Sequence, residues 1–122
     1  MTVADENGSL YQFQTSEVNG NIRIKIGDPN QTFSGQKIYI IKYHTTRAIA
    51  QLKAVDEIYW NTTGNEWAMP IYRAQASIVL PSGATLIQSA CYYGPKGSTN
   101  QCQSANEVRG AYIFNAPSTL NP

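Results

Sequence analysis

The sequence has little charge, and the charge that it has is nearly balanced. Charged residues make up 14% of the 122 residues, and nine basic against eight acidic side chains give a net charge of +1. Soluble globular domains average about a quarter charged residues. No cluster of lysines or arginines is long enough to follow a phosphate backbone. We therefore expect no nucleic acid partner.

Long hydrophobic runs are also absent from the sequence. No window approaches the roughly 18 apolar residues of a membrane-spanning helix. The first eight residues, Met1 to Gly8, have neither the basic start nor the apolar stretch of a signal peptide. As it stands the chain is expected to be soluble, which leaves room for a signal or an anchor in a longer parent protein.

The residues that usually carry catalysis are scarce. His44 is the only histidine, and no nucleophile-elbow pattern occurs in the chain. A nucleophilic triad would need this histidine beside an activated nucleophile and oriented by a carboxylate. We therefore expect His44 to be an exposed residue at a strand end, and the protein to be no enzyme, with no cofactor and no metal.

Three carboxylates, Asp56, Glu57 and Glu66, lie close in sequence to the two tryptophans. A pair of acids beside an aromatic sugar platform is the arrangement of a glycosidase. Acidic residues beside turns more often cap the turn or keep it hydrated, and we expect that role for these three carboxylates.

Only two cysteines are present, Cys91 and Cys102, with ten residues between them. A turn-rich loop of this length can bring two Cα atoms within disulfide range, so we expect a disulfide. Two inert thiols or a reactive thiol are the alternatives. A zinc site is a poor fit, because it needs four ligands and only His44 is left to add a nitrogen. A disulfide would place the chain in an oxidising compartment.

Short alternating runs between turn residues dominate the sequence. In Asn21–Ile26 the isoleucines face one way while Arg23 and Lys25 face the other, as in a half-buried strand. Arg47–Val55 is the one segment that competes as a helix. The other strands expected are Ser9–Gln14, Lys37–Tyr43 (apolar on both faces and so central), Arg47–Leu52, Glu57–Asn61, Ile71–Leu80, Thr85–Tyr92 and Ala111–Asn115. Seven to nine short strands at this spacing predict an all-β, antiparallel, immunoglobulin-like β-sandwich formed by a single domain over residues 1–122.

Both tryptophans flank a turn-like run, Asn61 to Asn65. If residues 57–61 form a strand, Trp60 shares a face with Ile58 and belongs to the core, while Trp67 covers the end of the sandwich with its indole N–H bonded. The alternative is a carbohydrate site in which sugars stack on Tyr59, Trp60, Trp67 and Tyr72.

One set of residues, spread over roughly residues 8–116, matches the pattern of a known family. These residues are Ile26-Gly27, Gly35, Tyr39–Tyr43, Asp56–Trp67, Pro70-Ile71, Ala76–Pro81, Cys91-Tyr92, Gly94, Gly97-Ser98 and Cys102. In them the sequence resembles the YciQ-like family, bacterial predicted membrane proteins of unknown function.

The resemblance implies a β-sandwich on the extracytoplasmic side of a bacterial membrane, attached in the parent protein to transmembrane helices. The family's paired cysteines support the disulfide between Cys91 and Cys102. Family members have further strands at both ends, so the chain looks like a central piece of a longer extracytoplasmic domain, or like a soluble relative. Missing strands would leave two sheet edges exposed, and open edges pair with other chains or with a copy of the same chain.

Together these features predict a non-enzymatic extracytoplasmic module of a bacterial envelope protein, which acts in protein interaction or assembly through its sheet edges. A carbohydrate-binding module that uses the aromatic residues named above, with a glycan as its ligand, is the alternative.

Overall fold

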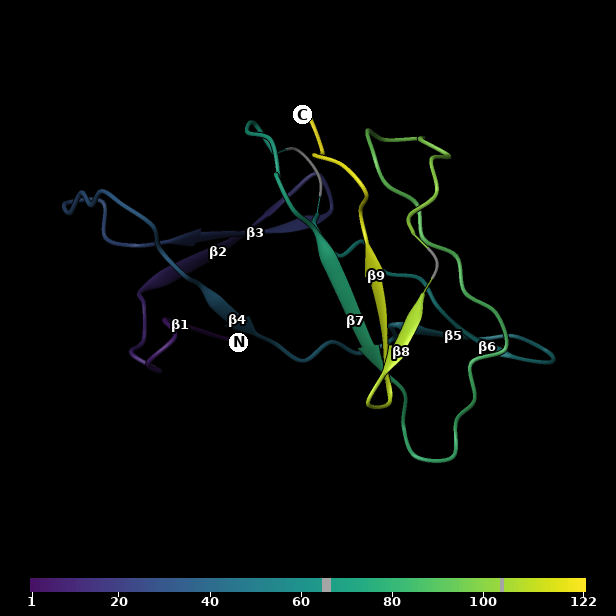
Figure 1. Ribbon diagram of the computed structural model, residues 1–122. Helices are drawn as coiled ribbons and strands as arrows, with labels where there is room; N and C mark the ends of the chain where they lie inside the picture. The colour runs from purple at the N-terminus through teal and green to yellow at the C-terminus, as the bar shows by residue number, and fades with distance from the viewer. Residues whose placement is uncertain (65–66, 104) are drawn as a thin grey trace. The chain divides into compact units, whose positions relative to one another are not determined.

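The computed structural model describes residues 1–64, 67–103 and 105–122, and the described chain is all-β (Figure 1). Short antiparallel strands make up its regular structure. In the described residues these strands are β1 (Thr2–Ala4), β2 (Phe13–Val18), β3 (Asn21–Ile26), β4 (Ile40–Lys42), β5 (Ile49–Gln51), β6 (Asp56–Ile58), β7 (Gln75–Val79), β8 (Asn106–Val108) and β9 (Ala111–Asn115).

The strands form small separate sheets, and the chain divides into two compact units. The first unit, Met1–Ile58, holds three two-stranded sheets, β1-β4, β2-β3 and β5-β6. The second unit, Tyr59–Pro122, holds one three-stranded sheet in the order β7-β9-β8. Antiparallel pairing is as predicted, but no sandwich topology is seen in the described residues.

Two hairpins are set by their turns. Asn19 and Gly20 connect β2 to β3, and Arg109 and Gly110 connect β8 to β9; in both turns the first residue has a φ of 52° and the glycine lies near 80°. Positive φ at both central residues is the geometry of a type I′ turn, whose twist matches that of the strands. The strand predicted at Ser9–Gln14 is wrong, because the Asn19-Gly20 turn pairs Phe13–Val18 with β3 instead.

Apolar burial is concentrated at one residue in each unit. Among the described residues Val3, on β1, is 1% exposed and Phe114, on β9, is 7% exposed. Phe114 lies opposite Ala76 on β7, and Tyr112, two residues earlier, lies opposite Ile78. These four side chains share one face of the three-stranded sheet because residues two apart on a strand point the same way. The core of the second unit therefore lies on this face.

Several strand predictions need correction. Lys37–Tyr43 was expected to be a central strand, but only Ile40–Lys42 is paired, and β1 is its single neighbour in the described chain. Thr85–Tyr92 contains no strand; Tyr92 makes one isolated bridge, to Gln101. Apolar alternation allows a strand, but a strand forms only where a second chain segment supplies hydrogen-bond partners. The Arg47–Val55 segment forms β5 and no helix, which settles that alternative.

Candidate functional site

The turn between the two tryptophans is closed by its own side chains. Asn61 Oδ1 accepts a hydrogen bond from the backbone N–H of Gly64 at 3.0 Å, and the indole Nε1 of Trp67 donates to the carbonyl oxygen of Thr63 at 2.6 Å. The indole N–H is therefore already used within the turn, as the sequence analysis expects. Trp67 as a whole remains 57% exposed. Asn65 and Glu66, which complete this connection, lie outside the described residues.

The other aromatic candidates are exposed as well. Tyr59 is 85% exposed, Tyr72 80% and Trp60 46%. Trp60 is expected in the core as part of a strand reaching residue 61, but β6 ends at Ile58 and Trp60 lies beyond its paired residues. All four aromatic candidates belong to the second unit. Their exposure suits stacking on a ligand as well as it suits contact with a protein.

Two of the three acidic candidates are adjacent on β6. Asp56 pairs with Gln51 and Glu57 with Ala50, so the two carboxylates point to opposite faces of the strand. They cannot flank one ligand from the same side. The third, Glu66, lies outside the described residues, and His44 is an exposed residue just beyond the end of β4.

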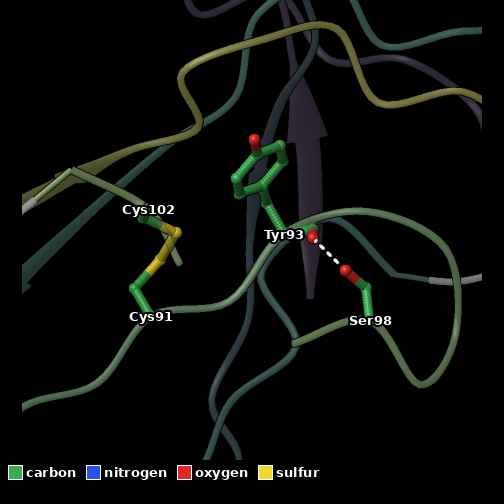
Figure 2. The surroundings of a disulfide bond; sticks show 4 residues. All are labelled: Cys91, Tyr93, Ser98 and Cys102. Atoms are coloured by element: carbon green, nitrogen blue, oxygen red, sulfur yellow. Dashed lines mark hydrogen bonds between the residues drawn. A yellow bond between two sulfur atoms is a disulfide. The ribbon is translucent and has the colours of Figure 1, made fainter. Parts of the chain in front are cut away.

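Cys91 and Cys102 form a disulfide, as predicted, and their Cα atoms are 5.3 Å apart (Figure 2). The bond closes a narrow hairpin. The backbone N–H of Cys102 donates to the carbonyl oxygen of Cys91, and that of Tyr93 donates to Asn100, each at 2.9 Å. The covalent bond and the hydrogen bonds therefore hold the same two chain segments together.

The tip of this hairpin is fixed by Ser98. Its Oγ donates to the carbonyl oxygen of Tyr93 at 2.8 Å, as Figure 2 shows, and accepts from the backbone N–H of Asn100 at 3.2 Å. Gly94 has a φ of 114°, and a Cβ on it would lie 2.8 Å from Ser98 Oγ. The tip thus needs glycine at this position and a small hydroxyl residue at 98.

A hollow of about 460 Å³ lies beside the disulfide. Tyr112 and Phe114 of β9 and Glu107 of β8 line it, together with Gln101 and Gln103 from the hairpin. Glu107 lies directly opposite Tyr112, so it belongs to the same face of the sheet. This hollow could not be predicted from the sequence, because nothing in the local pattern shows that residues 91–103 lie against β8 and β9.

The backbone of β7 leaves an open edge. The N–H of Ala116 donates to the carbonyl oxygen of Ala74 at 3.1 Å, in register with the β7-β9 ladder. In an antiparallel ladder hydrogen-bonded and non-hydrogen-bonded pairs alternate. Ala76 and Ile78 therefore direct their backbone groups toward β9. The backbone N–H and C=O groups of the remaining β7 residues, Gln75, Ser77 and Val79, point away from β9.

The opposite edge of the same sheet, β8, is much shorter. By the same alternation Asn106 and Val108 bond to β9, and only Glu107 directs its backbone groups outward. Within the described chain no further strand pairs with β7 or β8 (Figure 1). The sheet therefore offers one long open edge and one short edge that carries a charged residue.

These observations define a small antiparallel β-domain with one disulfide and an open sheet edge. Within the described residues no helix is long and apolar enough to cross a membrane. The chain belongs to the family described as the N-terminal domain of predicted membrane proteins, DUF2207, whose model matches residues 2–118. The family expected from the sequence is thus confirmed. Comparisons with curated proteins and with solved structures find no match.

Proposed function

We propose that this chain is a non-enzymatic interaction module on the extracytoplasmic side of a bacterial envelope protein, and that it binds other proteins through its sheet edges. The observation that carries the proposal is the open edge of β7, with the outward backbone groups of Gln75, Ser77 and Val79. An edge of this kind is a template for β-strand addition. We also propose the immunoglobulin-like β-sandwich that the sequence predicts for this domain.

The extracytoplasmic location is supported by the disulfide and by the family. Disulfides form and persist in oxidising compartments and are rare in the cytosol. The bond between Cys91 and Cys102 accounts for both cysteines of the chain. A domain of a predicted membrane protein that carries such a bond fits the outer side of the membrane.

The side chains of β7 favour a protein over a polar small molecule as the partner. Val79 is 72% exposed and lies at the end of the open edge. Strand addition uses main-chain hydrogen bonds for affinity and alternate side chains for specificity. An added strand would supply main-chain hydrogen bonds, and its side chains would cover Val79.

Carbohydrate binding is the second candidate, and the exposure of the aromatic residues favours it. Tyr59, Trp60, Trp67 and Tyr72 are all exposed and all lie in the second unit. A sugar would stack its apolar face on one of these rings. The Trp67 ring suits this best, because its N–H is bonded within the turn and holds the indole in place.

One NMR experiment separates the two candidates. The ¹⁵N-labelled chain is titrated with extended heptapeptides of alternating valine and threonine, and separately with a panel of envelope glycans. Strand addition shifts the amide resonances of Gln75, Ser77 and Val79 with the peptides. Sugar binding instead shifts the indole resonances of Trp60 and Trp67 with a glycan. Peptides that leave both edges of the β7-β9-β8 sheet unchanged would overturn the interaction proposal.

A further inference from the structure

We infer that the partner of the β7 edge is the β7 strand of a second copy of this chain, paired antiparallel about a two-fold axis at Ser77. This inference rests on the proposed function, because it names the partner of the same edge. The register of the ladder, the charges along the strand and the contrast between the two edges of the sheet support it.

The two edges differ in the features that block unwanted pairing. Natural edges are protected by short strands, by charged side chains and by proline. The β8 edge is three residues long, carries Glu107 at its centre and runs into Arg109. The β7 strand is five residues long and contains neither charge nor proline. Of the two edges of this sheet, the β7 edge is therefore the one open to a second strand.

The outward groups of β7 are self-complementary. With Ser77 opposite Ser77 of the second copy, Gln75 lies opposite Val79 of that copy, and Val79 opposite its Gln75. All three of these pairs join outward-facing residues, so each pair exchanges two N–H···O=C bonds. The two sheets would become one continuous sheet in which β7 is no longer an edge.

The side chains tolerate this register. Like charges directly opposite each other destabilise a strand pair, and the only charged residue next to the strand, Arg73, would lie opposite Pro81 of the second copy. Gln75 is already held by Asn115 on β9, through a hydrogen bond of 2.8 Å from Nε2 to Oδ1. The edge is thus neutral and partly ordered before pairing.

A strand pair of this length makes a small interface. Contacts that bury less than about 1,200 Å² belong to weak or transient complexes, so we expect a dissociation constant on the order of 100 μM in solution. In a membrane-attached parent protein, confinement to one surface raises the effective concentration. A weak contact would then suffice for assembly.

Charge reversal at Ser77 tests the pairing. Ser77 is exposed, so Ser77→Lys and Ser77→Glu leave the fold intact, which circular dichroism checks. Each variant places like charges opposite each other across the two-fold, and sedimentation velocity should show association weakened by about tenfold or more. An equimolar mixture of the two variants should restore the dimer, because lysine then faces glutamate. Thr85→Lys, an exposed change outside the strands, should associate like the wild type.

The outcomes keep this inference apart from the proposed function. Variants that associate like the wild type, or a mixture that does not recover, would overturn the pairing at Ser77. A wild-type chain that stays monomeric up to about 1 mM, ten times the expected dissociation constant, would overturn it too. If heptapeptides still shifted the β7 amides, the interaction proposal would stand without self-pairing; if they did not, both would fall.

Discussion

Gln75 and Asn115 lie directly opposite each other on β7 and β9, and the Gln75 Nε2 donates to the Asn115 Oδ1 at 2.8 Å. The two residues occupy a non-hydrogen-bonded position of the ladder, where opposite side chains come closest. Their side chains therefore tie the first residue of the edge strand to the central strand, while the backbone groups of Gln75 stay directed outward.

This pair should contribute modestly to stability. Gln75→Ala and Asn115→Ala should each lower the free energy of unfolding by about 0.5–1 kcal/mol, because a neutral hydrogen bond at an exposed position is worth little more. Urea unfolding of both single variants and the double variant gives the coupling between them. Strictly additive losses would mean that the two side chains do not interact in solution.

The disulfide should matter more than any single hydrogen bond. Cys91 and Cys102 are 11 positions apart, and cross-linking a loop of this length stabilises a fold by about 2–3 kcal/mol in the chain-entropy model. The Cys91→Ser/Cys102→Ser double variant should lose this amount in chemical unfolding. The wild type in excess reductant serves as control and should match the variant. An unchanged unfolding midpoint would show that the hairpin is held without the bond.

Gly94 and Gly97 form a matched pair at the hairpin tip. A Cβ at Gly94 would lie 2.8 Å from Ser98 Oγ, whereas a Cβ at Gly97 would meet nothing within 4 Å. Both have positive φ, so Gly97→Ala carries only the backbone cost, about 1–2 kcal/mol. Gly94→Ala should cost at least about 1 kcal/mol more, because Ser98 must move and give up its bonds. Equal losses in thermal unfolding would argue against the close contact.

The tryptophans should report their exposure directly. With Trp67 57% and Trp60 46% exposed, fluorescence should be red-shifted and readily quenched by acrylamide. Trp60→Phe and Trp67→Phe isolate each ring, and the variant that keeps Trp67 should be quenched more. Blue-shifted emission with weak quenching would place the rings in a core, as the sequence pattern had suggested for Trp60.

Where alternation and turn residues agree, the sequence predicts strands well. Asn21–Ile26 and Ala111–Asn115 have the bounds expected for them, because β-branched or aromatic residues alternate between clear turn signals. The strand β8 escaped prediction. Its sequence, Asn-Glu-Val, has no apolar face, and it pairs because the turn at Arg109-Gly110 folds it back on β9.

The candidate site could be predicted only in part. The disulfide follows from the spacing of two cysteines between turn residues, and the indole hydrogen bond of Trp67 follows from its place beside a turn. Neither the spacing of the cysteines nor the turn residues predict the open edge of β7. Which backbone groups point outward depends on the register with β9, whose residues follow their β7 partners by 40 positions at Gln75↔Asn115 and by 32 at Val79↔Ala111. Local pattern carries no information on that register.

Amide hydrogen exchange along β7 tests the central claim most directly. At low protein concentration the N–H groups of Ala76 and Ile78 should be protected by β9, while those of Gln75, Ser77 and Val79 should exchange freely. Raising the concentration of the chain should slow exchange at these three residues alone. Equal protection of all five amides at every concentration would mean that the edge is already occupied, and would contradict both the open edge and the function proposed for it.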